Sequence, residues 1–584
     1  MRRLNKNYGD PPKFSDLGGG DISRDQQTRF GLNPLKLLGC FVVCLMGLSV
    51  LFSISIILKD SSPNSIWAVA DARVLDNDIA SPRDFGQEDD PMESFVKHKK
   101  KLHSAGFEHE DKLLGGLLSS RLDQDSCLSR YESASYRKES PYKPSSFLIS
   151  KLRRYEALHK RCGPYTESYN KTVGKLKSNG MIEEEASDCK YLIWVSFSGL
   201  GNRILTLGSA FLYALLTDRV LLIDRGVDMD DLFCEPFPEV SWLLPLDFPI
   251  YDQFKTLNQK SPECFGSIVS NNSSSSSSSS SGYVYLHLVH DYDANDKLFF
   301  CDQDQSFLKN IPWVIMKSDN YFIPSLFLMP SFEQELLTLF PDQQTVFHFL
   351  GRYLFFPRNP IWGLITRYYD SYLSQADEKI GIQVRVFDTR PGPFQYVLDQ
   401  ILSCSLHNNF LPEIKQNESS VTPKNQISKA VMLTSLSSGY FEKIRDMYWE
   451  NPTVTGEVIQ VFQPSHEGYQ QTGKKMHNRK AWAEMYLLSL TDKLITSSWS
   501  TFGYVAQSLG GLNPWILSKP ENETTPNPAC TKAMSIEPCF HAPPFFDCKK
   551  RSGIDTGEVV PHVRHCEDMS WGLKLVNPIG VNVA

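Results

Sequence analysis

Residues 191–223 read YLIWVSFSGLGNRILTLGSAFLYALLTDRVLLI. The first seven residues form an apolar run of strand length, and the glycine-containing residues 198–202 predict a turn. Residues 204–216 carry apolar side chains at helical spacing, and residues 220–223 are strand-like again. The stretch therefore predicts a β-turn-α-β unit, the building block of an open parallel sheet.

The C-terminal half of the chain repeats this alternation. Because alternating strands and helices predict parallel sheets, we expect an α/β protein with two Rossmann-like domains and a cleft between them. Ligands in such folds bind beyond the carboxyl ends of the strands. The length of 584 residues, too large for one core, agrees with two domains. The predicted strands are 313–316, 380–387, 430–434, 458–462, 493–496 and 514–517, and the predicted helices are 441–449, 480–490 and 502–509.

One segment, residues 37–58, contains no charged residue and is almost entirely apolar or small. About 22 residues at ~1.5 Å per residue are enough to cross the hydrocarbon core of a bilayer. The segment is longer and farther from the N-terminus than the apolar part of a signal peptide. Basic residues precede it in 1–36 and acidic residues follow it in 71–93. The sequence therefore predicts a transmembrane signal anchor, a cytosolic tail at 1–36 and a lumenal body, as in a single-pass type II protein.

The lumenal part begins with a polar segment of mixed charge and few aromatic residues, 59–125. Such a composition predicts a flexible stem. The globular body that follows divides into an N-terminal domain at 126–375 and a C-terminal domain at 376–577, which ends in a cysteine-rich tail. The run of asparagines and serines at 271–281 predicts a disordered surface insertion in the first domain.

The chain has thirteen cysteines, two of which lie in the predicted anchor, so eleven remain in the lumenal part. In an oxidising compartment most of these should pair, and the odd count leaves at least one that is free or bonded to another chain. A zinc site formed by the tail cysteines with His541, His562 and His565 is a weaker alternative, because no tight C-x-x-C pair is present. Glycosylation sequons on surface loops are predicted at Asn170, Asn271, Asn272, Asn417 and Asn522.

The net charge of −7 argues against a nucleic-acid partner, although one or two arginines suffice for a local anion-binding pocket. Arg385 is the clearest candidate, because it lies in the otherwise apolar predicted strand 380–387. Strand alternation places Gln383 on the same face as Arg385. A buried arginine needs an anionic partner, and its planar guanidinium fits a diphosphate well. An internal salt bridge explains the residue equally well.

Two predicted turns between a strand and a helix also suit an anion. Glycines let the backbone approach a ligand closely, and a helix N-terminus presents unpaired N–H groups. Ordinary capping turns are the alternative explanation for both. The candidate residues are Gly199, Gly201, Asn202 and Arg203 in the first turn, and Ser498, Ser500, Thr501 and Phe502 in the second.

Several D-x-D triplets, including those at 228–230, 291–293 and 302–304, have the spacing that would hold a divalent metal on a diphosphate. Acidic residues are frequent enough in the chain for chance to explain most of them, and an arginine already supplies positive charge. We therefore expect neither a metal nor another cofactor. The aromatic and acidic segment 283–300 is typical of a carbohydrate groove and equally typical of a core strand.

Four stretches closely resemble the plant xyloglucan fucosyltransferase family: GLGNRILTLGSAFLYALLTDRVLL, KIGIQVRVFD, KAWAEMYLLSLTDKLITSSWSTFGYVAQSLGGLNPWIL and PHVRHCEDMSWGLKL. The likeness runs from about residue 140 to residue 577 and leaves out the tail, the stem and the serine run. It implies a Golgi type II enzyme that moves L-fucose from GDP-fucose to a galactose hydroxyl of a cell-wall glycan in an α-1,2 linkage. It also implies a GT-B-like arrangement of the two domains and inversion at the anomeric carbon without a metal.

The resemblance assigns roles to the candidate residues by motif match. Arg385 would hold the donor diphosphate, and the turn from Ser498 to Phe502 would cradle the nucleotide. Residues 199–203 would line the cleft from the first domain. The domain at 126–375 would then be the acceptor side, and the domain at 376–577 would bind GDP-fucose.

Fucosyl transfer also needs a base for the proton of the acceptor hydroxyl. Asp319 is the first candidate, because it follows the predicted strand 313–316 and so lies at a strand's carboxyl end. Asp293, Asp388 and Glu484 are alternatives, and a structural cap is the other explanation for Asp319.

The sequence leaves several partners open. The acceptor is either a polysaccharide such as xyloglucan or the glycan of an arabinogalactan protein, because acceptor grooves are built from variable loops. A non-catalytic Golgi scaffold or glycan-binding protein is the alternative from another class. A homodimer is also compatible with the sequence.

Overall fold

The computed structural model describes residues 111–178, 189–271, 282–388, 390–415, 427–549 and 552–578. The chain divides into two compact units, Met1–His103 and Ser104–Ala584, and the described residues all belong to the second. None of the helices within the described ranges is long and apolar enough to cross a membrane. The predicted anchor at 37–58, the serine run and the sequons at Asn272 and Asn417 lie outside these ranges.

The first sheet has four parallel strands in the order β2-β1-β4-β3. They are almost wholly buried, which explains why their sequences read as continuous apolar runs rather than as an alternation. The strands are β1 (Tyr191–Val195), β2 (Val220–Ile223), β3 (Tyr283–Leu288) and β4 (Trp313–Ser318).

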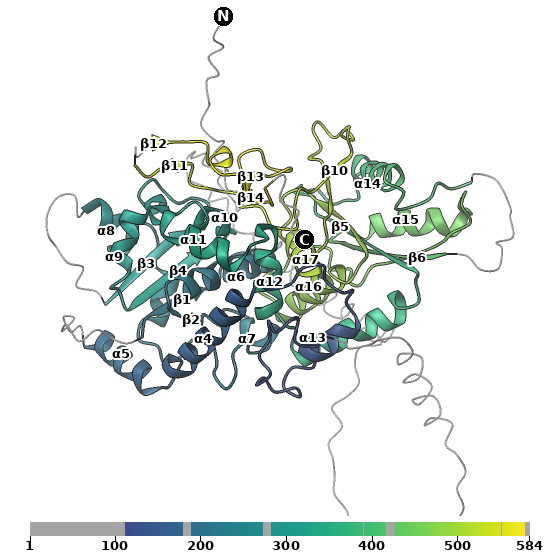
Figure 1. The fold of residues 1–584 in the computed structure, drawn as a ribbon. Coiled ribbons are helices and arrows are strands. Elements are labelled where there is room, and N and C mark those ends of the chain that lie inside the picture. The colour runs from purple at the N-terminus through teal and green to yellow at the C-terminus, as the bar shows by residue number, and fades with distance from the viewer. Residues whose placement is uncertain are drawn as a thin grey trace, which may run out of the picture. The chain divides into compact units, whose positions relative to one another are not determined.

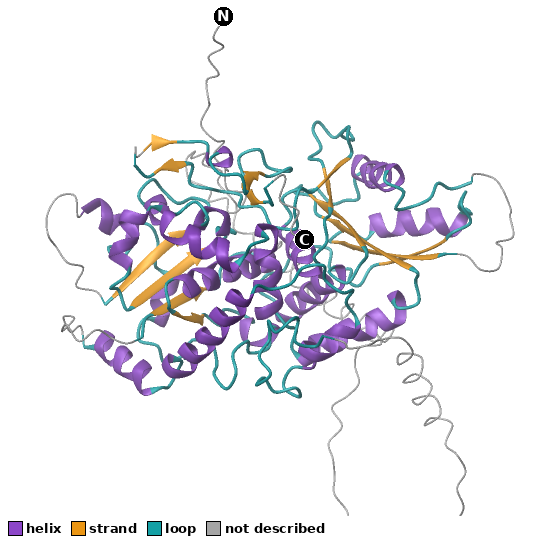
Figure 2. Ribbon diagram, in the orientation of Figure 1, coloured by secondary structure: helices purple, strands orange, loops and turns teal. Residues whose placement is uncertain are grey.

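The second sheet has six strands in the order β10-β9-β8-β5-β6-β7, all parallel except the edge strand β10. Figure 2 shows the strands of the two sheets as separate groups surrounded by helices. The predicted α/β class with parallel sheets is therefore confirmed. The strands are β5 (Glu378–Val384), β6 (Ser428–Ser435), β7 (Val458–Phe462), β8 (Lys493–Ser497), β9 (Trp515–Leu517) and β10 (Cys530–Lys532).

Four helices lie between the two sheets: α6 (Leu200–Leu216), α12 (Val346–Leu354), α16 (Lys475–Leu488) and α17 (Thr501–Gly510) (Figure 1). Small residues let them approach closely, since a Cβ added at Gly208 would lie 2.8 Å from the Phe347 ring. The other α-helices of the described ranges are α3 (Leu128–Glu132), α4 (Ser146–Cys162), α5 (Glu167–Lys177), α7 (Met229–Leu232), α8 (Phe265–Asn271), α9 (Asp302–Leu308), α10 (Ile323–Leu326), α11 (Pro330–Leu339), α13 (Asn359–Tyr368), α14 (Gln395–His407) and α15 (Gly439–Glu450).

The C-terminal segment returns from the second sheet to the first domain. It contains two small hairpins, β11 (Phe546–Asp547) with β12 (Ser552–Gly553) and β13 (Val563–His565) with β14 (Leu573–Leu575), drawn in yellow in Figure 1. A disulfide between Cys301 and Cys548 fastens the segment to the first domain.

Ten of the eleven cysteines after the predicted anchor form disulfides, and Cys264 is buried and unpaired. The prediction that most of them pair and that one is left over is confirmed. The bonds are Cys127–Cys234, Cys162–Cys189, Cys301–Cys548, Cys404–Cys530 and Cys539–Cys566.

Among the predicted boundaries that differ from the structure, three concern the candidate site or the stem. Strand β5 ends at Val384 rather than at residue 387, because the backbone N–H of Arg385 donates to the Ser497 hydroxyl and no longer to a strand carbonyl. Helix α6 begins at Leu200, so residues 200–202 are its first turn rather than a loop. The end of the predicted stem, 111–125, packs on the body through side chains such as Leu117, which is 1% exposed.

Candidate functional site

The second sheet has a point at its carboxyl edge where neighbouring strands connect in opposite directions. It lies between β5, which leads to β6 and β7, and β8, which leads to β9 and β10. Crevices that bind ligands in open parallel sheets form at such points. Arg385 follows β5 directly and so lies at this switch point, whereas Asp319 follows β4 directly and lies at the carboxyl end of a strand of the first sheet.

The turns before α6 and α17 have matching backbone geometry. Ser198 has φ 71° and Trp499 has φ 60°, and each stands directly before the N-cap residue of its helix, Gly199 and Ser500. The left-handed region costs a residue with a side chain about 1–2 kcal/mol, so the surroundings must hold both turns in place. Neither helix has a side-chain hydrogen bond at its N-cap, which leaves its first-turn N–H groups for another acceptor.

The two helix N-termini touch each other. The Thr501 hydroxyl donates to Asn202 Oδ1 at 2.8 Å. A Cβ added at Gly201 would lie 2.5 Å from Thr501 Oγ1 and 2.9 Å from its carbonyl carbon, so only glycine fits there. Three predicted ligand-binding residues, Gly201, Asn202 and Thr501, thus bring together the turn that follows β1 and the turn that follows β8.

Arg203 is buried and paired with an internal carboxylate instead of facing the cleft. Its side chain is 4% exposed, and Nη1 donates to Asp228 Oδ1 at 2.6 Å. Asn478 of α16 donates to the other oxygen of Asp228 at 2.5 Å, so the cluster links α6 with α16. The prediction that Arg203 contacts the donor is not supported by this position. Asp228, the first residue of a D-x-D triplet, is fully buried in the same cluster.

The surroundings of Arg385 contrast with those of Arg203. Its guanidinium is half-buried, its Nη2 donates to Gln470 Oε1 at 3.1 Å, and it lies 5.1 Å from the centre of the Phe387 ring. Within the described part of the chain it forms no ion pair, and burial alone lowers its pKa. The internal salt bridge that would explain the residue structurally is therefore absent from that part of the chain.

Gln383 does not lie on one face together with Arg385, as the alternation predicted. Its side chain is 4% exposed, and Oε1 accepts from the Thr496 hydroxyl at 2.8 Å, inside the sheet. Alternation predicted that Gln383 and Arg385 point to the same side of one strand. Because the strand ends at Val384, Arg385 lies beyond it at the edge of the sheet, whereas Gln383 stays inside the sheet.

The two serines of the second turn are turned toward the protein interior. The Ser498 hydroxyl donates to the carbonyl of Leu517, and Ser500 is 3% exposed, whereas Phe502 is half-buried. The hydroxyls of Ser498 and Ser500 thus face the protein. The backbone N–H groups of this turn are better placed than the hydroxyls to meet a phosphate.

Asp568, in the C-terminal segment, fixes this turn. This residue was not identified from the sequence. Its Oδ2 accepts from the Trp499 N–H at 2.9 Å and from the Tyr504 hydroxyl at 2.5 Å. Its backbone carbonyl accepts from the Trp499 indole N–H. The carboxylate thereby holds the residue with positive φ. No local pattern distinguishes Asp568, because its partners lie 64 or more positions away in the sequence.

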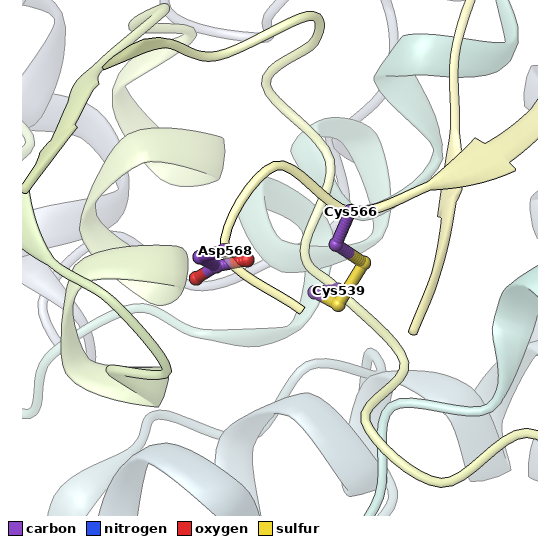
Figure 3. Close-up of side chains that lie close together, drawn as sticks. All are labelled: Cys539, Cys566 and Asp568. Atoms are coloured by element: carbon purple, nitrogen blue, oxygen red, sulfur yellow. A yellow bond between two sulfur atoms is a disulfide. The ribbon is translucent and has the colours of Figure 1, made fainter. Parts of the chain in front are cut away.

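Figure 3 shows Asp568 beside Cys539 and Cys566, a grouping close enough to suggest a metal site. The two sulfurs are joined in a disulfide and offer no thiolate. None of the three tail histidines predicted as alternative ligands belongs to this grouping. His541 Nε2 lies 3.1 Å from the Tyr504 hydroxyl, and His565 pairs with Asp555.

Asp319 is not an isolated carboxylate. Oδ1 accepts from the backbone N–H of His290 at 2.9 Å and from Asn320 Nδ2 at 2.8 Å, and Oδ2 lies 2.5 Å from His290 Nδ1. The Asp319 side chain is 10% exposed and that of His290 is 56% exposed. The carboxylate thus lies behind the imidazole.

The three alternatives to Asp319 have other partners. Asp388 binds Arg390 through both oxygens, at 3.1 and 2.7 Å. Asp293 accepts from the N–H groups of residues 295 and 296 at 2.8 and 2.9 Å, in the manner of a cap. Glu484 is buried and accepts from the Ser465 hydroxyl at 2.5 Å, and desolvation raises its pKa to about 7.

A loop at 463–474, between β7 and α16, lies over this region. Its Gln470 contacts Arg385, and a Cβ added at Gly199 would lie 3.1 Å from Gln470 Nε2. Glu467 fastens the loop to α16 by accepting from Lys480 at 2.6 Å, and it lies 3.0 Å from His477. These hydrogen bonds lower the pKa of Glu467. The loop therefore bridges the first turn and the arginine.

The glycosylation sites are described in part. Asn170 in α5 and Asn522 in a loop are both exposed to solvent, as a glycan requires. Asn271 is the last residue of α8. Glycosylation at the five sequons stays a prediction.

Residues 88–549 match the family described as xyloglucan fucosyltransferase. The chain is 61% identical over 570 residues to a galactoside 2-alpha-L-fucosyltransferase of Pisum sativum, covering 97% of this chain and 96% of that protein. It is 60% identical over 557 residues to a galactoside 2-alpha-L-fucosyltransferase of Arabidopsis thaliana, covering 94% and 95%. A solved structure of a mutant of Arabidopsis thaliana FUT1 in complex with GDP is 64% identical, with a TM-score of 0.76 and coverage of 80% of this chain and 100% of that one. The chain belongs to the xyloglucan fucosyltransferase family, as its motifs predicted.

Proposed function

We propose that this protein transfers L-fucose from GDP-fucose to a galactose hydroxyl of a cell-wall glycan such as xyloglucan, forming an α-1,2 linkage with inversion of the anomeric centre. The family name and the names of the two relatives support the reaction and the bond formed. The GDP in the Arabidopsis structure supports the donor.

The observation that carries the proposal is the state of Arg385. It is a half-buried guanidinium without an ion pair in the described part of the chain, at the switch point of a parallel sheet. Desolvating such a charge is costly unless an anion binds to it. A nucleoside diphosphate supplies that anion and matches the guanidinium geometrically.

The chemistry follows from this position. As the bond between fucose and the diphosphate breaks, negative charge grows on the leaving GDP, and the sugar passes through an oxocarbenium-like state. Arg385 and the first-turn N–H groups of α17 would stabilise that charge. We expect the transfer to need no metal, because these groups meet the diphosphate and Asp228 is committed to Arg203.

The setting proposed for the reaction is the Golgi lumen. We propose that 37–58 anchors the protein as a type II membrane protein and that the two sheets form a GT-B-like pair, with the acceptor on the side of the first. The five disulfides suit an oxidising compartment. A homodimer stays a prediction, which light scattering of the detergent-solubilised chain tests.

The direct test is fucosyl transfer by the full chain and by its Arg385→Ala variant. Both are incubated with labelled GDP-fucose and a panel of wall polysaccharides and arabinogalactan proteins, and the labelled product is identified. Arg445→Ala is the matched control, because Arg445 is half-exposed on α15 and paired with its neighbour Asp446. We expect label on xyloglucan, loss of transfer with Arg385→Ala and no change with Arg445→Ala.

Other outcomes separate the alternatives. Label found only on arabinogalactan proteins would keep the reaction and change the acceptor. Absence of both transfer and donor hydrolysis with every acceptor would instead favour a scaffold or glycan-binding protein. Normal activity of Arg385→Ala would remove the arginine from the mechanism.

A further inference from the structure

We propose that His290 is the catalytic base that takes the proton of the acceptor hydroxyl, and that Asp319 is the positioning residue that orients its imidazole. The inference rests on the proposed fucosyl transfer and revises the role that the sequence suggested for Asp319.

The contact between the two residues fixes the ring. His290 approaches Asp319 with two atoms, Nδ1 at 2.5 Å from Oδ2 and the backbone N–H at 2.9 Å from Oδ1. Asn320 Nδ2 holds Oδ1 at 2.8 Å. The Ser318 hydroxyl donates to the carbonyl of Leu288 at 2.8 Å and so ties the end of β4 to the end of β3. The segment bearing His290 is thereby held against the residue that ends the neighbouring strand.

Exposure decides which of the two groups an acceptor can reach. The imidazole is 56% exposed, and the carboxylate behind it is 10% exposed. Both oxygens of Asp319 are already engaged, so a hydroxyl would have to displace one of their partners to reach either of them. When Nδ1–H donates to Asp319, the neutral ring carries its lone pair on Nε2, which makes that atom the proton acceptor.

An electrostatic interaction links this pair to the residues that hold the donor turn. Burial lowers the pKa of His541, and the nearby charges of Asp568 and Asp319 both oppose that shift. His541 Nε2 lies 3.1 Å from the Tyr504 hydroxyl, which donates to Asp568, and Asp568 holds Trp499. The pair therefore belongs to the same polar network as the turn expected to bind the nucleotide.

The proposed step transfers fucose to the acceptor oxygen and releases GDP and a proton. The acceptor oxygen forms a bond to C1 of fucose, while the bond from C1 to the diphosphate oxygen breaks and its electron pair leaves with GDP. The hydroxyl proton moves to Nε2 of His290, and Asp319 offsets the charge of the imidazolium that forms. The imidazolium releases its proton to solvent after GDP departs. The products are the fucosylated acceptor, GDP and one proton.

The test compares the full chain with His290→Gln, Asp319→Asn and the double variant. In Asp319→Asn the amide oxygen should keep the Oδ1 position, where two donors meet, which turns Nδ2 toward His290 Nδ1. The ring would then carry its proton on Nε2 and could not accept another. We expect each single variant to lower the transfer rate about 10²- to 10⁴-fold, with no further loss in the double variant.

GDP affinity from calorimetry should stay within about twofold of wild type in all three variants, because the pair lies on the acceptor side. His407→Gln is the matched control, since His407 is exposed in the last turn of α14, and it should change nothing. In a His290→Ala variant, added imidazole should restore part of the rate, which a purely structural role would not allow.

Other results would contradict the role proposed for His290. If His290→Gln keeps transfer near the wild-type rate, or loses GDP binding together with transfer, the proposal is overturned. If Asp319→Asn is inactive while His290→Gln is active, the carboxylate itself is the base. In each of these outcomes the wild-type protein still binds GDP and transfers fucose. If the proposed function itself were wrong, the wild-type protein would do neither, so the two kinds of failure can be told apart.

Discussion

Replacing Asp228 by asparagine removes the only carboxylate paired with Arg203 in the described part of the chain. Asp228 has no exposed surface, and its two oxygens accept from Arg203 at 2.6 Å and from Asn478 at 2.5 Å. The Nε and Nη2 atoms of Arg203 are buried and have no hydrogen-bond partner in the structure. The variant would therefore leave a buried guanidinium without its counter-charge, at a contact that joins α6 to α16.

The expected size of the effect follows from this burial. Removing one partner of a buried ion pair costs about 3–5 kcal/mol, because the remaining charge stays desolvated. Asp230→Asn is the matched control in the same triplet. Its carboxylate is 37% exposed and lies 3.7 Å from Arg225, which is 31% exposed. A pair this exposed is worth about 1 kcal/mol at most.

The assay is urea unfolding of the two variants and wild type with the disulfides intact. We expect the free energy of the first unfolding transition to fall by about 3–5 kcal/mol for Asp228→Asn and by less than about 1 kcal/mol for Asp230→Asn. Equal stability of the two variants would refute the reasoning that the Arg203 cluster is a buried link between α6 and α16.

Three further predictions concern other parts of the molecule. Asp568→Ala should raise the dissociation constant for GDP about tenfold by releasing the donor turn, measured by calorimetry, and an unchanged constant would contradict its role. Burial raises the pKa of Glu484 from 4.5 to about 7, so the folded state binds the extra proton and wild-type stability should fall as pH rises from about 4.5 to 7. Glu484→Gln should flatten that slope in unfolding titrations, and a slope equal to that of wild type would exclude Glu484 as its cause. Gly201→Ala should destabilise the protein, because the added Cβ would lie 2.5 Å from Thr501 Oγ1. Gly174→Ala in α5 meets open space and should stabilise the protein by about 0.5–1 kcal/mol. Equal shifts of the melting temperature in the two variants would contradict this prediction.

Sequence patterns located most strands of the second sheet. The strand at 458–462 was predicted with its observed bounds, because a β-branched apolar run is closed by Gly456 before it and by Pro464 after it. The strand ending in Arg385 was predicted too long, because alternation continues through Val386 and Phe387. Phe387 is 64% exposed, so the pattern there does not report burial in the sheet.

The candidate site was predictable only where it depends on strand ends. Asp319 and Arg385 could be placed because each follows a recognisable strand. The pairing of His290 with Asp319 joins residues 29 apart, and that of Trp499 with Asp568 joins residues 69 apart. Such pairings are set by tertiary packing, which periodicity does not encode. For the same reason Arg203 looked like a ligand, although it is an internal partner of Asp228.

The central claim is that Arg385 stands at the edge of the second sheet to bind a nucleoside diphosphate. Calorimetric titration of GDP into the full chain and its Arg385→Ala variant, both in the presence of a chelator, tests it most directly. A charge-assisted hydrogen bond is worth about 1.5–3 kcal/mol, so we expect wild type to bind GDP and the variant to bind it about 10- to 100-fold more weakly. Equal affinity of the two proteins for GDP would contradict the account.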